Sequence, residues 1–462
     1  MRLMRRVVCG SAVIALVLGA GAWGGQALQQ AAPAPLAPAT LPATQALLDG
    51  YVRDNKMPGI VAALGVGEAP TLFASAGRIA DDAGAAPAGP DSLWRVYSMT
   101  KPITAMAAMM LIDDGKIRLD QPVSDFIPGF AHMTVLTDPQ HSLASRPARH
   151  PVTIRNLLTH TAGLGYNIVT KGPLLAEYNR LGINPAAIDA RLERPARAAR
   201  PKTLQAFAAR VATLPLVAEP GTRWSYSIGL DVMGAVIEKA SGMPFDAFVQ
   251  TRIFDPLRMN SSYWTVPRSE VGRLATNYIY TREAMAALGR PVDPAKVPAK
   301  ARLPLDAAAQ SVWLSPPSFP YGGAGLVMSA RDYDRFLHAL QDYGTLDGVR
   351  VLKPETAHLM MSNLLPRGVT FGGVGAATGG PGAGPKMGFG AGGSVYLEDV
   401  PGGGARGTYG WGGAAGTIAF VDPARHLRGV VMVNYFPAER WGLRGAVGPA
   451  LFADAARLTR AQ

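Results

Sequence analysis

The chain has 462 residues, of which 48% are hydrophobic and 17% charged, and this composition excludes global disorder because it can supply a sizeable core. The formal net charge is +12, yet no aromatic side chains interleave with the basic stretches, which argues against nucleic-acid binding. The single cysteine, Cys9, lies within the apolar N-terminal run, so the mature chain would have no disulfide, thiolate nucleophile or zinc–cysteine site.

The first residues have the layout of a secretory signal peptide. Three arginines among the first six residues precede the uncharged apolar run 7–22, which is short for a membrane-spanning helix. We therefore predict a signal peptide over 1–27 and a Pro/Ala-rich linker over 28–42. The protein is expected to be exported, to the periplasm in a Gram-negative host, without stable membrane insertion once the signal is cleaved. An uncleaved signal would anchor it instead.

Periodic patterns after the linker predict a helix and then a hairpin. Residues 43–55 place apolar side chains on one helical face. Two short apolar segments follow, Gly59–Val66 and Thr71–Gly77, and turn-forming residues separate them. A second helical pattern begins after Ser98.

The second half of the chain repeats these signals in reverse order. An apolar stripe over 230–240 predicts a helix that ends at Gly242. Two strand-like segments, 417–421 and 427–435, flank a turn, and 443–460 predicts a closing helix. The order helix, hairpin, helical middle, hairpin, helix predicts an α/β (α+β) fold in which two terminal helices cover an antiparallel sheet.

This pattern divides the mature chain into two domains. We predict an α/β sheet domain formed by 43–112 and 318–462, and a mostly helical domain over 113–317. The Gly-rich segment Gly368–Gly407 is expected to be a flexible flap or a long surface loop. We interpret the basic stretch Arg191–Lys202 as a solvated, partly mobile loop rather than a surface that binds anions.

Ser98 and Lys101 are the first candidates for chemistry. They open a helical pattern, and a spacing of three residues puts both side chains on one helical face. A serine hydroxyl needs a neighbour to take its proton, and a lysine can do so when burial or nearby positive potential lowers its pKa. The alternative interpretation is an ordinary helix N-cap followed by a surface lysine.

Two further segments add weaker signals. Tyr226 precedes the 230–240 helix in a loop next to Arg223, and a tyrosine near cations can relay a proton. Glycines flank Trp411 at a predicted strand start, where a backbone N–H paired with that of Ser98 could form an oxyanion hole. Alone, the first is better explained as a tyrosine packed on a helix start, and the second as a bulge or tight turn.

Together these motifs resemble the serine β-lactamase and penicillin-binding superfamily, in order and spacing, from about residue 43 to 460. The branch most similar to this sequence is that of the family VIII carboxylesterases, which often carry Trp-Gly-Gly in place of Lys-Thr-Gly. The matching elements are Ser98-x-x-Lys101, Tyr226-Ser227-Ile228 for Tyr-x-Asn at its first position only, Trp411-Gly412-Gly413 for Lys-Thr-Gly, 157–164 and 322–326.

The resemblance implies a β-lactamase-like fold and an acyl-enzyme on Ser98, with no cofactor and no metal. Lys101 and Tyr226 would share the proton of Ser98, and the N–H groups of Ser98 and Ala414 would form the oxyanion hole. The substrate would be a small-molecule ester bound by Trp411, Gly412, Gly413 and Ile228.

Two departures from the superfamily pattern concern the substrate. Trp411 replaces a lysine that would bind the carboxylate of a β-lactam or a peptidoglycan stem, and it offers an apolar wall with one N–H donor instead. Ile228 replaces an asparagine that could bind an amide side chain. Both changes favour an uncharged, fairly apolar ester over lactams and D-Ala-D-Ala peptides.

Several alternatives stay open. Within the same fold these are a β-lactamase, a D,D-peptidase and an acyltransferase, and from another class a non-catalytic binding protein of the envelope. An α/β-hydrolase is disfavoured because no serine has a Gly-x-Ser-x-Gly setting, and a zinc hydrolase because the seven histidines show no His-Glu-x-x-His spacing. We interpret His160 as a core or loop residue.

Overall fold

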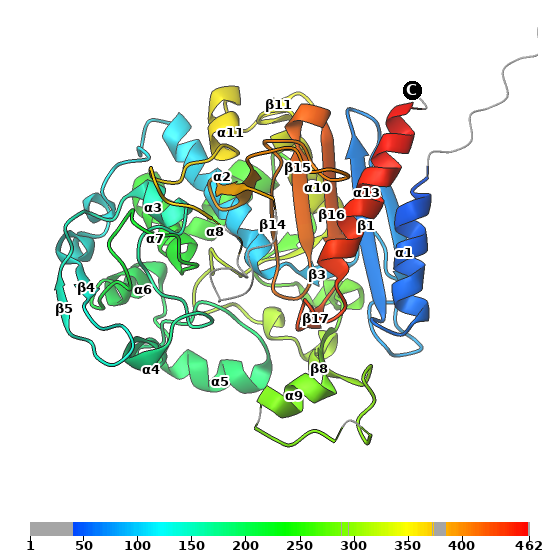
Figure 1. Ribbon diagram of the computed structural model, residues 1–462, viewed down its shortest axis with the longest axis horizontal. Helices are drawn as coiled ribbons and strands as arrows, with labels where there is room; N and C mark the ends of the chain where they lie inside the picture. Colours follow the sequence, from blue (N-terminus) through cyan, green and yellow to red (C-terminus); the bar gives the residue numbers. More distant parts are fainter. Residues whose placement is uncertain (1–39, 288, 294, 372, 374–384, 461–462) are drawn as a thin grey trace, which may run out of the picture. The chain divides into compact units, whose positions relative to one another are not determined.

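A computed structural model describes residues 40–460 of the protein, apart from 288, 294, 372 and 374–384 (Figure 1). The predicted signal peptide, 1–27, and nearly all of the predicted linker, 28–42, lie outside these residues. The described residues belong to one compact unit. Within them, no helix combines the length and apolarity that crossing a membrane requires.

A seven-stranded sheet forms the centre of the described fold, and every neighbouring pair of its strands is antiparallel. It is assembled from both ends of the chain, because the first hairpin joins five strands from the C-terminal part. In spatial order the strands are β12 (Met387–Phe389), β13 (Ser394–Tyr396), β14 (Tyr409–Gly412), β15 (Ile418–Asp422), β16 (Leu427–Met432), β1 (Gly59–Val66) and β2 (Leu72–Gly77).

Helices cover both faces of this sheet, as Figure 1 shows. The terminal helices α1 (Pro42–Arg53) and α13 (Leu443–Arg460) pack together on one face, and α10 (Ala330–Gln341) packs on the other. Strand β1 shows why: Ile60, Ala62 and Leu64 are buried with the terminal helices, whereas the alternate residues Val61 and Ala63 belong to the larger core. A strand buried on both faces reads as a continuous apolar run, which is how 59–66 reads.

Helix α2 (Thr100–Asp113) is buried at every residue from Thr100 to Leu111. Helix α7 (Gly229–Ser241) packs against it and ends at Gly242, which has the left-handed conformation that glycine favours (φ +74°). The other helices are α3 (Ile154–Leu158), α4 (Gly172–Arg180), α5 (Ala190–Ala199), α6 (Leu204–Val211), α8 (Phe245–Val249), α9 (Thr281–Ala287) and α11 (Pro354–Met360).

Small sheets connect the central sheet to the helices. One has the order β3–β9–β6 and another β17–β7–β8, and two further pairs are β4–β5 and β10–β11. The strands are β3 (Leu93–Arg95), β4 (Thr134–Leu136), β5 (Ser145–Pro147), β6 (Ser262–Tyr263), β7 (Asn277–Tyr280), β8 (Arg302–Asp306), β9 (Val327–Ser329), β10 (Thr345–Leu346), β11 (Val349–Arg350) and β17 (Tyr435–Phe436).

The structure confirms the predicted terminal helices, both hairpins and the helices after Ser98 and before Gly242. Two segment predictions are wrong. The described part of Gly368–Gly407 is not only a loop, because it contributes β12 and β13 to the sheet edge. Most of the basic stretch is α5, and Arg200 behind it is buried, where its guanidinium binds Glu193 and the Tyr321 hydroxyl. The proposed split at 113 and 318 stays a prediction.

Candidate active site

Ser98 lies in a single 3-10 turn, Tyr97–Met99, between strand β3 and helix α2. Tyr97 has a left-handed backbone (φ +43°), which is uncommon for a residue with a large side chain. Its buried ring is held edge-on by Trp313 and Phe436, each with ring centroids 5.6 Å away, and its hydroxyl accepts a hydrogen bond from Asn277 Nδ2 at 3.1 Å. These contacts hold the unusual turn that presents Ser98.

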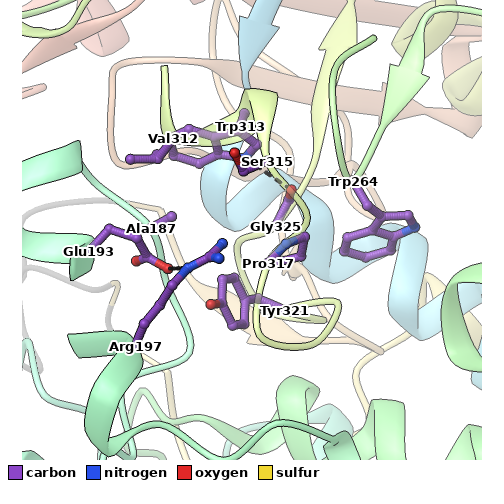
Figure 2. A pocket seen from close by; sticks show the side chains of 10 residues that line it. All are labelled: Ala187, Glu193, Arg197, Trp264, Val312, Trp313, Ser315, Pro317, Tyr321 and Gly325. Carbon is purple, nitrogen blue, oxygen red and sulfur yellow. Dashed lines mark hydrogen bonds and ion pairs between the residues drawn. The ribbon is translucent and has the colours of Figure 1, made fainter. Parts of the chain in front are cut away.

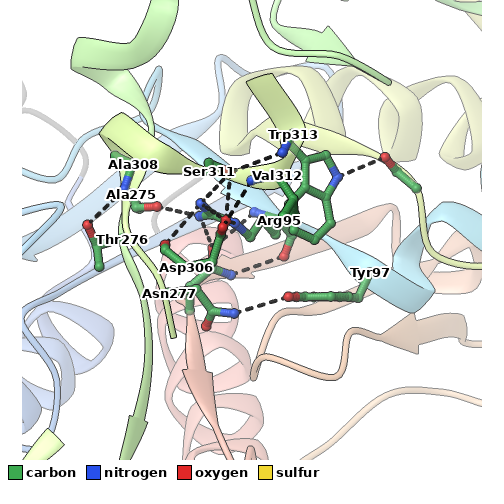
Figure 3. Close-up of polar contacts among 12 residues, drawn as sticks. Arg95, Tyr97, Ala275, Thr276, Asn277, Asp306, Ala308, Ser311, Val312 and Trp313 are labelled. Carbon is green, nitrogen blue, oxygen red and sulfur yellow. Dashed lines mark hydrogen bonds and ion pairs between the residues drawn. The ribbon is translucent and has the colours of Figure 1, made fainter. Parts of the chain in front are cut away.

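A buried ion pair supports the strand that enters this turn (Figure 3). Arg95 has no exposed surface, and its Nε donates to Asp306 Oδ2 at 2.7 Å. The two terminal nitrogens donate to the Ala275 carbonyl oxygen and to Ser311 Oγ, at 2.5 and 3.0 Å. Asn434 Oδ1 accepts from the Arg95 backbone N–H at 3.0 Å. The pair therefore joins β3 to segments that lie far away in the sequence.

Lys101 lies one helical turn beyond Ser98 and has no exposed surface. Its Nζ donates to Ser98 Oγ at 3.3 Å and to the carbonyl oxygen of Gly323 at 2.8 Å. The same nitrogen lies 4.7 Å from the centre of the Tyr226 ring and 5.4 Å from that of Tyr166. The predicted pairing of Ser98 with Lys101 is thus present as a direct contact.

Tyr226 comes from the loop before α7, 128 residues further along the chain, and its hydroxyl donates to Ser98 Oγ at 2.7 Å. His160 supports this loop. Its Nδ1 accepts from the Ser227 backbone N–H at 3.2 Å, and its ring packs on Tyr226 with centroids 4.8 Å apart. Burial, followed by the charge of Lys101, lowers the pKa of His160 well below its usual value. A neutral imidazole suits this supporting contact.

The end of β14 approaches the Ser98 turn from the sheet. A Cβ on Gly413 would lie 2.3 Å from the backbone oxygen of Val96 and 2.2 Å from Thr417 Oγ1, so only glycine fits there. Ala414 follows and is exposed, whereas Ser98 is 8% exposed. The segments that carry the two predicted oxyanion-hole N–H groups are therefore neighbours, and the hole itself stays a prediction.

Aromatic side chains surround the three polar groups. Trp411 is half-buried and packs against Phe389 and Tyr226, with centroids 5.1 and 5.8 Å apart. Trp224 and Phe371 extend the wall, with centroids 4.6 Å apart. Trp411 is therefore placed beside the reacting residues by its contact with Tyr226. Of the other predicted substrate-binding residues, Gly412 follows Trp411 in β14, and Ile228 is fully buried at the start of α7.

Sequence analysis assigned no site role to Asp231, and it matched Gly323 only as part of the element 322–326. Asp231 lies in the first turn of α7 with no exposed surface, and its Oδ1 accepts from the Gly323 backbone N–H at 2.8 Å. Burial raises its pKa to about 7, against the opposing effects of the Lys101 charge and the Gly323 N–H. A lone acid within an apolar helix stripe was the available signal, but it reads equally well as a helix cap.

A separate hollow lies beside the loop that carries Gly323 (Figure 2). Its lining includes Trp264, Trp313, Tyr321 and Gly325, and Glu193 of α5, which forms an ion pair with Arg197 at 2.9 Å. Ser98 does not line it. The candidate site is therefore identified by its converging polar groups and not by the size of a hollow.

One group among the described residues has ligand atoms close enough to hold a metal ion. Glu68, His338 and Asp342 place these atoms within 4.8 Å of one another. They belong to the β1–β2 turn and to α10, and not to the elements that carry Ser98, Lys101 and Tyr226. Nothing in this arrangement connects the group to the chemistry of Ser98.

Comparisons with known proteins show the family to which the chain belongs. Residues 44–447 match the family model described as Beta-lactamase. The chain is 33% identical over 400 residues to esterase EstB of Burkholderia gladioli, an alignment that covers 84% of this chain and 89% of EstB. The structural resemblance extends over most of the chain as well.

A solved structure described as EstCE1, a hydrolase with promiscuous acyltransferase activity, is 25% identical with a TM-score of 0.66, over 90% of this chain and 97% of that one. A variant of simvastatin synthase from Aspergillus terreus has the same fold, with a TM-score of 0.70 at 23% identity over 90% and 95% of the two chains. The predicted resemblance and fold class are confirmed. The chain belongs to the β-lactamase family of serine hydrolases and has its α/β fold.

Proposed function

We propose that this protein is a carboxylesterase that hydrolyses small, uncharged, fairly apolar esters through an acyl-enzyme on Ser98. The observation that carries the proposal is the convergence on Ser98 Oγ, which lies 3.3 Å from Lys101 Nζ and 2.7 Å from the Tyr226 hydroxyl inside an aromatic wall. Such a nucleophile with two adjacent proton carriers suits acyl transfer. The esterase relative supports the same substrate class.

The proposed cycle uses these groups in sequence. Ser98 Oγ attacks the ester carbonyl carbon, and its proton passes to Lys101 or Tyr226. The carbonyl oxygen becomes an oxyanion, which the backbone N–H groups of Ser98 and Ala414 would stabilise. The bond to the alcohol then breaks, and the alcohol leaves with a proton supplied through Tyr226. Water attacks the acyl-enzyme, releases the acid and returns the proton to Ser98.

The surroundings of Trp411 support an uncharged acyl group. Its indole has no cation to offer a substrate carboxylate, and it packs among Phe389, Phe371 and Tyr226. A lactam or D-Ala peptide would bring a carboxylate to this apolar wall, where its desolvation is unfavourable. We therefore place esters ahead of the β-lactamase and D,D-peptidase alternatives.

Acyl transfer to an alcohol is a second candidate activity, favoured by one observation. EstCE1, which matches along nearly its whole length, is described as a hydrolase with promiscuous acyltransferase activity. An acyl-enzyme in an apolar site can be attacked by an alcohol in place of water. Adding methanol to the ester assay and measuring the ratio of methyl ester to free acid separates the two activities.

The first experiment measures turnover of p-nitrophenyl acetate, butyrate and octanoate beside a chromogenic cephalosporin, with Ser98→Ala as the matched control. We expect rapid ester turnover, slow cephalosporin turnover, and loss of both in the variant. Faster cephalosporin turnover would assign the protein as a β-lactamase. Ester turnover that survives Ser98→Ala would refute the mechanism, and a protein that neither turns over esters nor reacts with a fluorophosphonate would be a binding protein.

A further inference from the structure

Asp231 is a buried acid that the proposed cycle does not use. Its side chain has no exposed surface, and among the described residues its Oδ2 has no hydrogen-bond partner. A buried carboxylate with an unpaired oxygen is costly to the folded protein. Its pKa, which burial raises to about 7, expresses the same cost. The contacts of the Asp231 carboxyl explain why it is kept here despite this cost.

The backbone of one residue, Gly323, connects Asp231 to the nucleophile. The Gly323 N–H donates to Asp231 Oδ1 at 2.8 Å, and the Gly323 carbonyl oxygen accepts from Lys101 Nζ at 2.8 Å. Lys101 Nζ in turn donates to Ser98 Oγ at 3.3 Å. A Cβ on Gly323 would lie 2.6 Å from Asp231 Oδ2, so the carboxyl packs directly on this backbone. The carboxyl, the loop and the lysine are thus in unbroken contact.

The charges around Lys101 indicate a role for the contact between Asp231 and Gly323. When Ser98 loses its proton to Lys101, an ammonium forms on a side chain that has no exposed surface. The Lys101 charge acts on Asp231, and the Asp231 charge acts on Tyr166. The other titratable groups that face this space are Tyr226, from the loop before α7, and His160, from the segment after α3, and the Lys101 charge also acts on His160. Asp231 is the acid among these groups, so it supplies their negative charge.

We propose that Asp231 is a positioning residue, whose carboxylate fixes the Gly323 backbone and balances the ammonium that forms on Lys101 when Ser98 is activated. This inference rests on the proposed esterase function. It adds an acidic group to the candidate site formed by Ser98, Lys101 and Tyr226. Protonation of Asp231 below about pH 7 would remove the balancing charge, so the rate of acylation is expected to fall on the acidic side.

Asp231→Asn tests the charge while keeping the shape, because an asparagine oxygen can still accept from Gly323. We expect kcat for p-nitrophenyl butyrate to fall about 10- to 100-fold, the loss typical of removing an outer group that orients a reactive one, while KM changes little. The acidic limb of the pH profile should flatten. The rate of Ser98 labelling by a fluorophosphonate should fall in parallel. Asp332→Asn is the matched control, since Asp332 is also buried with a raised pKa but accepts from Ser261 and Ser262.

The melting temperature distinguishes this role from a merely structural one, because the loss of a structural contact would lower it. If Asp231 is kept for its charge, Asp231→Asn should raise the melting temperature at pH 8. An unchanged kcat and pH profile, or a melting temperature lowered equally at pH 5 and pH 8, would overturn the proposal. Failure of the wild-type protein to hydrolyse any ester would instead count against the proposed function. The labelling rates would still test Asp231 in that case.

Discussion

Two buried basic side chains flank Ser98 at equal distances along the chain, and their surroundings differ. Arg95, three residues before Ser98, binds the Asp306 carboxylate directly and also donates to the Ala275 carbonyl oxygen and to Ser311 Oγ. Lys101, three residues after, reaches its carboxylate, Asp231, only through the backbone of Gly323. Asp306 accepts from three partners, whereas Asp231 Oδ2 accepts from none among the described residues.

This difference indicates that Arg95 holds the turn, whereas Lys101 takes part in the chemistry. A buried pair whose hydrogen bonds are all made is rigid, and breaking it is strongly destabilising. A basic side chain without a direct counter-ion is left to contact a reacting hydroxyl, and its neighbouring acid carries the cost of burial. We therefore expect Arg95 and Asp306 to determine stability, and Lys101 and Asp231 to determine rate.

The largest expected effect is on rate. Lys101→Met should lower kcat/KM for p-nitrophenyl butyrate by about 10⁴-fold, as for removal of a proton carrier that acts as a unit with its nucleophile. The melting temperature should stay close to that of the wild type, because an apolar chain of similar length fills the buried space. A variant that unfolds instead would contradict the separation of roles.

Breaking the other pair should give the opposite result. Asp306→Ala leaves the Arg95 guanidinium buried without its counter-ion, a change that costs about 3–5 kcal/mol of unfolding free energy. Urea unfolding followed by circular dichroism measures it. Asp91→Ala is the control, because Asp91 forms an exposed ion pair with Arg331 that is worth at most about 1 kcal/mol.

Asp231→Asn should be more stabilising at high pH than at low pH. The pKa of Asp231 is about 7 in the folded protein and ordinarily 3.8, so between those two pH values the folded protein binds a proton that the unfolded chain has lost. Stability is therefore lost as pH rises through that window. The substitution should remove this loss, with a gain about 3 kcal/mol larger at pH 8 than at pH 5. Equal effects at the two pH values would show that folding does not raise the pKa of Asp231 into this range.

The smallest expected effect concerns the turn itself. Tyr97→Phe removes the hydroxyl that accepts from Asn277 but keeps both edge-on ring contacts, and should cost about 1 kcal/mol. Because the ring contacts are kept, kcat should change less than twofold. A large loss of kcat without a loss of stability would show that this single hydrogen bond aligns Ser98.

The sequence was sufficient to predict much of the fold and the pairing at the nucleophile. Ser98 and Lys101 are one helical turn apart, so local geometry alone brings them together. The unbroken apolar run over 59–66 is enough to predict a buried strand. Tyr226 was found by resemblance, since no local rule brings residues 128 positions apart into contact.

Contacts between residues far apart in the sequence could not be predicted from local patterns. Asp231 and Gly323 are 92 residues apart, and their hydrogen bond depends on how α7 packs beside the loop before β9. Strands β12 and β13 were missed because glycine is depleted in strands, and edge pairing of the sheet outweighs that preference here. Helix α5 was missed because it buries only Glu193 and so shows no apolar stripe, and Glu193 pairs with Arg200 just beyond the helix.

The close approach of glycines to this site bears on how the protein could acquire new substrates. Gly323 and Gly413 leave no volume for a Cβ, so neither position offers a route to altered selectivity. Trp411 and Phe371, by contrast, face one another across the aromatic wall at 6.2 Å between ring centroids, and their side chains can be exchanged without disturbing a backbone contact to Ser98. A mutational library directed at these two aromatics would explore substrate range at low risk to the fold, whereas randomising the glycine loops would return mostly inactive chains.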